Sequence, residues 1–597
     1  MSSIPKQIAE SANLCETTAK AIFPQAFLTA HPSEAAAATY LRDPSIQKLV
    51  QFFGAKGLAA LKDEDQREKW YDDWLAYQAQ HHLYADLLAP RQYSTRGGEL
   101  NLLRLTRFFE VFGYCSPSHG YSFQVTFLGL FSILMGANSA VKTEAVAKLE
   151  RGGLLAFGIS EKRHGSDLLA NEFVIKEDPP GQFMANGVKN YIGNSNCASM
   201  ISILARLEQP QTAGRARRPT LALFVLRPEE STGFRDLRKI RTLGVRAAFV
   251  GEFSVKDHRL PRTDVIAEGR KAWDAVLGTV ALGKFFLGFG QIGICEHAFE
   301  EAAIYLRGRI LYGNPAVQMT HLKSGMAEAH ARLTAMKLYA YRALDYVQTS
   351  SAADRRYLLF TAVQKAKVGT EGVKVMGLLS ACTGAFGFKS ETYLEMAIRD
   401  AQLIPILEGS AHINLDMAAQ FLPAYFGHFD SGAAVPGSMF AGQIAAAENP
   451  YLMEAVTNHL NNIRFPRFSK AYRPLRSMPN VRTFARQSAG FGLFIRRARI
   501  KGVRLADPET TIALGNCLAT ITYAQLIAEN CLMLNVPPPM ISRIFHILVQ
   551  DLSISALNVA TLPALDDADR MRIRRLIVVP ETRGADWDFE ADQASNA

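Results

Sequence analysis

The segment RDAQLIPILEGSAH, residues 399–412, places one carboxylate, Glu408, at the end of a nearly uncharged run and directly before a Gly-Ser pair. A carboxylate in apolar surroundings loses hydration, so its pKa rises toward the value that suits a proton-abstracting base at neutral pH. The same segment also fits an ordinary helix start, with Gly409 and Ser410 as turn residues. Either interpretation fits these residues alone, and the rest of the chain has to decide between them.

Length and composition indicate a large intracellular protein. The chain has 597 residues and is 48% hydrophobic, which is enough for several cores. Its seven cysteines are odd in number and never form a C-x-x-C pair, so we expect reduced thiols and neither a disulfide framework nor a zinc site. The N-terminus lacks a basic start followed by an apolar core, which predicts a cytoplasmic protein without a secretory signal.

The positive charge is concentrated in one segment. Net charge is +10, yet residues 464–504 alone hold ten Arg and two Lys and no Asp or Glu. These cations are interleaved with aromatic and aliphatic residues. Such a segment can rest on an anionic membrane, dock an acidic acyl carrier protein or follow the phosphates of a nucleic acid. It can equally pair with the acidic surface of another subunit.

The periodicity of apolar residues predicts four regions. Residues 1–153 are expected to form a helical domain, 154–262 a central antiparallel β domain, 263–430 a helical bundle, and 431–597 a basic helical extension with a loose acidic tail after 580. In the bundle we expect helices over 272–306, 317–348, 354–379 and 413–426. The most apolar stretch, 121–137, contains Gln124 and Thr126 and is short for a membrane span, so it predicts a buried helix.

Short motifs at the joints of these regions resemble the acyl-CoA dehydrogenase family. They occur in the family's order over about 33–423: FGISEKRHGSD at 157–167, NGVKNYIGN at 186–194, LRGRILYGNP at 306–315, GAFGF at 384–388, IRD at 398–400 and LEGS at 407–410. No G-x-G-x-x-G or G-x-x-x-x-G-K-S/T motif opens a predicted helix, so Rossmann and P-loop interpretations fail. The resemblance implies a mainly α fold with a central β domain and a four-helix bundle, which together bind FAD and an acyl thioester.

The resemblance also implies the reaction. Glu408 matches the base of the straight-chain branches, which removes the α proton of a medium-to-long acyl-CoA while the β hydrogen leaves as hydride to flavin N5. The product is a trans-2-enoyl thioester. Lys284 takes the place of a substrate-side arginine, and Ser166 lies where the family contacts the thioester. The implied cofactor-binding residues are Phe157, Ile159, Ser160, Gly165, Ser166, Tyr191, Gly193, Arg309, Gly384, Gly409, Ser410 and His412.

Particular roles follow from the same alignment. Tyr191 replaces the family's Trp against the flavin ring, and Arg309 matches an arginine that reaches the FAD of a neighbouring subunit, where a guanidinium suits a pyrophosphate. The sequence departs from the pattern at Gly193, which replaces a Thr or Ser, and at Ala381 and Thr320, which replace two Gln. Each lost contact costs about 0.5–1.5 kcal/mol of cofactor binding.

The length beyond residue 422 resembles the very-long-chain and complex-I-assembly branch. That likeness implies a homodimer, peripheral association with the inner face of a membrane, and an electron-transferring flavoprotein or oxygen as electron acceptor. An acyl dehydrogenase for carrier-protein-bound substrates stays open. So do a nucleic-acid-binding flavoprotein like the alkylation-response branch and a non-catalytic assembly factor. His164 and His412 have no metal-ligand spacing, and no metal is expected.

Overall fold

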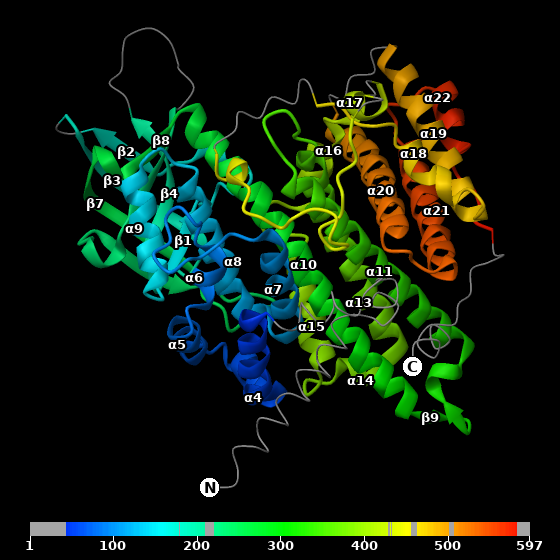
Figure 1. Ribbon diagram of the computed structural model, residues 1–597, viewed down its shortest axis with the longest axis horizontal. Helices are drawn as coiled ribbons and strands as arrows, with labels where there is room; N and C mark the ends of the chain where they lie inside the picture. The colour runs from blue at the N-terminus through cyan, green and yellow to red at the C-terminus, as the bar shows by residue number, and fades with distance from the viewer. Residues whose placement is uncertain are drawn as a thin grey trace.

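The protein folds into an α-helical body with a β domain at one end. The computed structural model describes residues 43–177, 180–208, 220–427, 430, 433–454, 463–500 and 507–581, with the side chains of 498–500 outside the description (Figure 1). The first 42 residues of the predicted N-terminal helical domain, and the predicted loose tail beyond residue 581, lie outside the described residues.

The N-terminal helices pack around one apolar helix. Helix α8 is apolar on every side, and it is buried between β1 and α10, which confirms the buried helix predicted for 121–137. Asn101 caps α7 by accepting a hydrogen bond from the Arg104 amide. The helices are α4 (Pro44–Arg67), α5 (Asp72–Gln80), α6 (Leu83–Leu88), α7 (Leu102–Cys115), α8 (Pro117–Leu134) and α9 (Ser139–Glu150).

The β domain is one mixed sheet with the strand order β6-β7-β3-β2-β4-β5-β8, and β1 pairs with β4. Its strands are β1 (Leu154–Gly158), β2 (Val174–Glu177), β3 (Gln182–Gly193), β4 (Ala198–Glu208), β5 (Thr220–Leu226), β6 (Phe234–Lys239), β7 (Val250–Pro261) and β8 (Val265–Glu268). The prediction of a purely antiparallel domain is wrong in one respect, because β4 runs parallel to both β1 and β2. The segments joining these parallel pairs contain other strands, so the absence of crossover helices did not exclude parallel pairing.

The helical bundle is built on α10 (Arg270–Gly308), which packs against α7, α8, α11, α13 and α15. The predicted helices over 272–306 and 317–348 are confirmed with shifted ends, whereas the one over 413–426 is divided into two helices, Ala411–Ala419 and Leu422–Gly427. The prediction over 354–379 is realised as two α-helices joined by a π-helical turn at Gln364–Val368. The remaining elements are α11 (Thr320–Gln348), α12 (Tyr357–Val363), α13 (Gly369–Thr383), α14 (Ala385–Phe388), α15 (Tyr393–Leu403), α16 (Ala411–Ala419) and α17 (Leu422–Gly427), with the short strands β9 (Ile310–Leu311) and β10 (Asn314–Pro315).

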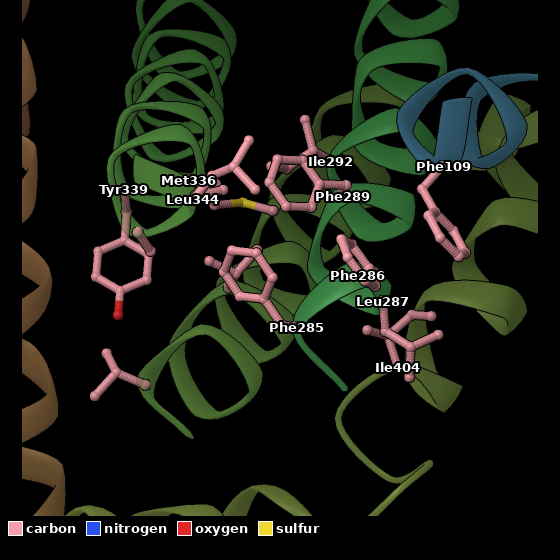
Figure 2. Packing of buried hydrophobic residues seen from close by; sticks show 14 of the residues in the cluster. Phe109, Phe285, Phe286, Leu287, Phe289, Ile292, Met336, Tyr339, Leu344 and Ile404 are labelled. Carbon is pink, nitrogen blue, oxygen red and sulfur yellow. The ribbon is translucent and has the colours of Figure 1, made fainter. Parts of the chain in front are cut away.

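Aromatic side chains fill the interior on both sides of α10. Phe286 stacks on Phe109 of α7 with ring centroids 5.4 Å apart, while Phe285 and Phe289 lie on the side that faces α11 (Figure 2). Aromatic pairs of this kind contribute about 0.5–1.5 kcal/mol each beyond their buried area. The middle of α10 is therefore held firmly where it passes Glu408.

The C-terminal extension lies against the bundle on the side opposite the β domain (Figure 1). Helix α20 packs on α11 and α16, and α21 packs on α11. The extension consists of α18 (Ser469–Tyr472), α19 (Pro479–Ile500), α20 (Pro508–Met533), α21 (Pro538–Ala560) and α22 (Asp567–Arg574).

Three helices, α10, α20 and α21, are long and apolar enough to cross a membrane by length and composition. Between 78% and 83% of their most apolar windows is buried inside the protein. Their apolar surfaces are thus used in packing against other helices.

Candidate active site

Glu408 lies on a tight loop between α15 and α16. Its backbone is in the left-handed region with φ +56°, and Gly409 follows at φ +92°. Asn414, one turn into α16, holds the loop by donating to the carbonyls of Gly409 and Ser410 at 3.1 and 2.9 Å. A non-glycine residue in this region is strained by about 1–3 kcal/mol, and such strain gathers at functional sites. The loop aims the Glu408 side chain inward instead of serving as an ordinary helix start.

The Glu408 carboxylate accepts a hydrogen bond from one polar side chain of α8, that of Gln124. The Gln124 side-chain amide donates to Glu408 Oε1 and also to the Gly283 carbonyl of α10 at 3.0 Å. These two acceptors fix which way the Gln124 amide points. Glu408 Oε2 and Gln124 Oε1 are buried and accept no hydrogen bond from the residues that the structure describes. Two acceptors are therefore left for groups that the described chain does not supply.

Two buried lysines face Glu408 without forming an ion pair with it. Lys284 of α10 is 3% exposed and donates to Asn414 Oδ1 at 2.7 Å. Lys365, in the π-helical turn, is 1% exposed and donates to the Ile404 carbonyl at the end of α15. Among the described residues no salt bridge within 4.0 Å joins either ammonium to Glu408. The structure thus brings the predicted Lys284 and Glu408 together and adds Lys365.

Burial governs the protonation of this cluster. It raises the pKa of Glu408 to about 7, while Gln124 and the two lysines oppose that rise. Burial lowers the pKa of Lys284 to about 8 and also lowers that of Lys365, and in both cases Glu408 opposes the shift. A carboxylate whose pKa lies near neutrality can release and take up a proton at physiological pH, as a general base requires.

The motifs at 157–167 and 186–194 are joined by a buried ion pair. Lys189 donates to Glu161 at 2.9 Å and to the Ile159 carbonyl at 3.2 Å. The Ser160 hydroxyl donates to the Asn190 carbonyl at 2.7 Å, so its proton is engaged within the protein. These contacts fix the Ile159–Ser160 backbone beside β3. Glu161 and Lys189 of the two motifs therefore have a structural role, which is to hold this backbone in place.

The end of β3 presents an aromatic ring to the outside. Tyr191 has φ +62°, lies at an irregularity in the pairing with β7, and is 60% exposed. It is therefore no core residue. Gly193 is buried against α8, and Phe157 of β1 is buried in the core. Gly165 and Ser166 lie exposed in the loop before β2, where His164 Nδ1 donates to the Asp167 carboxylate at 2.8 Å.

A second group of predicted residues gathers at the far end of α10. Arg309 lies over the Tyr305 ring at 5.5 Å and donates to its hydroxyl, and Tyr305 stacks on Phe386 of the GAFGF segment. Gly384 begins this segment with φ +56°. It lines a cleft of about 570 Å³ together with Ser380, Gly387, Phe388, Ser390, Glu395, Ile398 and Arg399.

The two groups lie far apart on one subunit. Lys284 and Arg309 are separated by 25 residues of a continuous helix, which corresponds to about 37 Å along its axis. The group of Arg309, Tyr305 and Phe386 therefore lies apart from the residues around Glu408. His412, on the first turn of α16, is exposed.

The residues around Glu408 fit a bound flavin and thioester. At the end of β3 the exposed Tyr191 ring offers a surface on which a flat ring can stack. Glu408 Oε2 and Gln124 Oε1 can each accept a hydrogen bond from a ligand. The Glu408 amide donates to no backbone carbonyl among the described residues, which leaves it available to a thioester oxygen. Cofactor contacts for individual residues stay predictions.

Sequence reasoning missed two members of this cluster. Gln124 had a signal, since it is one of few polar residues in an apolar run. Lys365 stands among the polar residues QKAK inside an apolar helix, and only the π-helical turn directs it toward Glu408.

Comparison with known proteins shows that the fold and site belong to an FAD-dependent oxidoreductase. The family model "Acyl-CoA dehydrogenase, middle domain" matches residues 156–258, and "Acyl-CoA dehydrogenase, C-terminal domain" matches 271–422. The chain belongs to the acyl-CoA dehydrogenase family, whose members use FAD.

Individual relatives are distant. The cyclohex-1-ene-1-carbonyl-CoA dehydrogenase of Syntrophus aciditrophicus is 25% identical over 55% of this chain and 79% of its own length. The glutaryl-CoA dehydrogenase of Desulfococcus multivorans is 24% identical over 62% of this chain and 93% of its own. Among solved structures, an acyl-CoA dehydrogenase complexed with FAD from Bacillus anthracis matches with TM-score 0.69 and 16% identity. The match covers 92% of this chain and 94% of that one, so the two folds agree beyond the bundle.

Proposed function

We propose that the protein introduces an α,β double bond into a medium-to-long straight-chain acyl thioester, with Glu408 as the base. The observation that carries this proposal is a buried carboxylate, held on a strained loop, with one oxygen unpaired and a pKa raised to about 7. Removal of a proton next to a thioester carbonyl needs such a group.

The chain's own residues would act in four ways. Glu408 Oε2 takes the α proton, and Gln124 holds the other oxygen so that Oε2 keeps its direction. The Glu408 amide polarises the thioester oxygen, and the positive charges of Lys284 and Lys365 favour negative charge that develops on the substrate. FAD, when bound, supplies the acceptor for the β hydrogen.

The proposal is tested by anaerobic titration of the FAD-loaded protein with acyl thioesters of increasing chain length. We expect loss of the visible flavin absorbance with the wild type and with Glu391→Gln, a control for an exposed carboxylate. Glu408→Gln should keep FAD and bind the thioester without this absorbance loss. Undiminished loss in Glu408→Gln would refute the assignment.

We also propose a homodimer in which each FAD is bound between two subunits. The separation of Arg309 and Gly384 from the Glu408 site supports this, since one subunit presents both halves at distant places. Co-expression of Glu408→Gln chains with Arg309→Ala chains distinguishes the arrangements. A shared site restores one intact active centre per mixed dimer, whereas unshared sites leave every centre defective.

The basic segment is proposed to dock an anionic partner at the cytoplasmic face of the membrane or on an acyl carrier protein. Its aromatic residues Phe465, Phe468 and Phe491 are buried, so the described part offers mainly charge. The exposed cations are Arg464, Arg467, Lys470, Arg473, Arg476, Arg482, Arg486, Arg496 and Arg497. One structural neighbour is a prolyl acyl carrier protein oxidase, AnaB, with TM-score 0.54 and 20% identity over 63% of this chain and 97% of its own.

Vesicles containing anionic lipid, carrier protein and duplex DNA should be compared as partners in salt titrations. Binding to carrier protein together with preference for carrier-bound substrates would favour the biosynthetic alternative. Binding to DNA without thioester turnover would favour the nucleic-acid alternative.

A further inference from the structure

Gly193 leaves room that a tyrosine of another element fills. A Cβ atom built on Gly193 would lie 2.7 Å from Tyr121 Cε1, 3.3 Å from Tyr121 Cζ and 2.5 Å from Val125 Cγ2. Real side chains do not tolerate such contacts, so any residue other than glycine at 193 would displace both Val125 and the Tyr121 ring. The end of β3 and the first half of α8 are thus complementary at this point.

Asn194 fixes this contact. Its side-chain amide donates to the Ser122 carbonyl and the Thr126 hydroxyl of α8, at 3.0 and 3.2 Å, and to the Leu155 carbonyl of β1 at 3.1 Å. These bonds are buried, and buried hydrogen bonds resist local opening. The Tyr121 ring therefore keeps its place against Gly193.

The Tyr121 hydroxyl belongs to the surroundings of Glu408. Tyr121 lies one helical turn before Gln124, on the same side of α8. The negative charge of Glu408 adds to burial in raising the pKa of the Tyr121 phenol, so the phenol keeps its proton. No hydrogen bond from this hydroxyl to another described residue is present. The surroundings of Glu408 thus hold a phenol that donates to no described residue and two buried acceptors, Glu408 Oε2 and Gln124 Oε1, that accept from none.

We propose that Tyr121 is a ligand-binding residue whose hydroxyl donates a hydrogen bond to an acceptor atom of the bound flavin ring or thioester, and that glycine at 193 exists to admit it. This inference rests on the proposed function. The two ligands share the relevant chemistry, an uncharged oxygen or ring nitrogen. Tyr121 would provide a donor at a place where Gly193 has no side chain to provide one.

Tyr121→Phe removes only the hydroxyl and tests the proposal with FAD-loaded protein. If the acceptor is on the flavin, the visible flavin spectrum shifts and FAD binds about 2- to 12-fold more weakly before any thioester is added. If it is on the thioester, the spectrum is unchanged, and a non-reducible acyl thioester analogue binds more weakly by the same factor. The control is Tyr114→Phe, whose hydroxyl donates to Glu300 away from this site.

The glycine half of the proposal has its own test. Gly193→Ser should lose FAD or thioester affinity and melting temperature because Tyr121 and Val125 are displaced. Tyr121→Ala together with Val125→Ala in the same chain should restore the melting temperature by freeing the space, without restoring the ligand affinity that needs the Tyr121 hydroxyl. An unchanged spectrum and unchanged affinities in Tyr121→Phe, or no recovery of the melting temperature in the combined variant, would overturn the proposal. If wild-type protein is reduced by thioesters in either case, the proposed function itself stands.

Discussion

Two regions of this protein bury charged side chains, and they do so in opposite ways. Where the extension meets the bundle, Arg342 is fully buried and lies 2.9 Å from Glu529 of α20 and 2.8 Å from Asp345. Around Glu408, two buried lysines face one carboxylate, and no ion pair within 4.0 Å is present among the described residues. Paired charges satisfy each other and hold two layers together, whereas separated charges leave donors and acceptors for a ligand.

The largest effect is expected at the paired site. Arg342→Met leaves Asp345 and Glu529 buried without their cation, and removal of one partner of a buried pair costs about 3–5 kcal/mol of unfolding free energy. Denaturant unfolding should show this loss, with a control in exposed Arg486→Met. A change below about 1 kcal/mol would contradict the structural role given to the pair.

A smaller and different effect is expected at Lys365. Because its charge favours the ionised form of Glu408, Lys365→Met should raise the pKa of Glu408 further and move the rising limb of the pH–rate profile upward by about one unit. At a pH below the rising limb, the variant should therefore reduce its flavin about 10-fold more slowly than the wild type.

The control for Lys365 lies two residues along the same turn. Lys367 points to Glu371 at 3.3 Å, so Lys367→Met should lower stability and leave the limb in place. A uniform loss of rate at every pH in Lys365→Met would show that this lysine only supports the fold.

The smallest effect on stability is expected at the exposed cations. Replacing Arg473, Arg476, Arg482 and Arg486 by Gln should change the unfolding free energy by less than about 0.5 kcal/mol per site. The same replacements should remove salt-sensitive binding to the anionic partner. Retained binding would place the docking surface elsewhere.

The sequence allowed much of the fold to be predicted because helices such as α10 and α11 carry a continuous apolar period. Glu408 could be predicted only from the order of the motifs along the chain, because its own neighbours, Gly409 and Ser410, also fit an ordinary helix start. The parallel pairing of β4 could not, since it depends on which distant strands meet.

Parts of the site depend on tertiary contacts in the same way. Lys365 faces Glu408 from a π-helical turn, and the Tyr121 ring packs closely on the end of β3 only because Gly193 has no side chain. A local sequence window contains neither fact. Such residues are identified once several elements are placed together.

The central claim is that Glu408 is a base whose pKa is raised by burial between α8 and α10. The most direct measurement is the pH dependence of the anaerobic rate of flavin reduction by an acyl thioester, recorded by rapid mixing with wild-type protein. Because the ionised form acts as the base, the rate should rise with pH and reach half its maximum near pH 7. A rate that stays constant from about pH 6 to about pH 8, or the same rising limb in Glu408→Gln, would contradict the account.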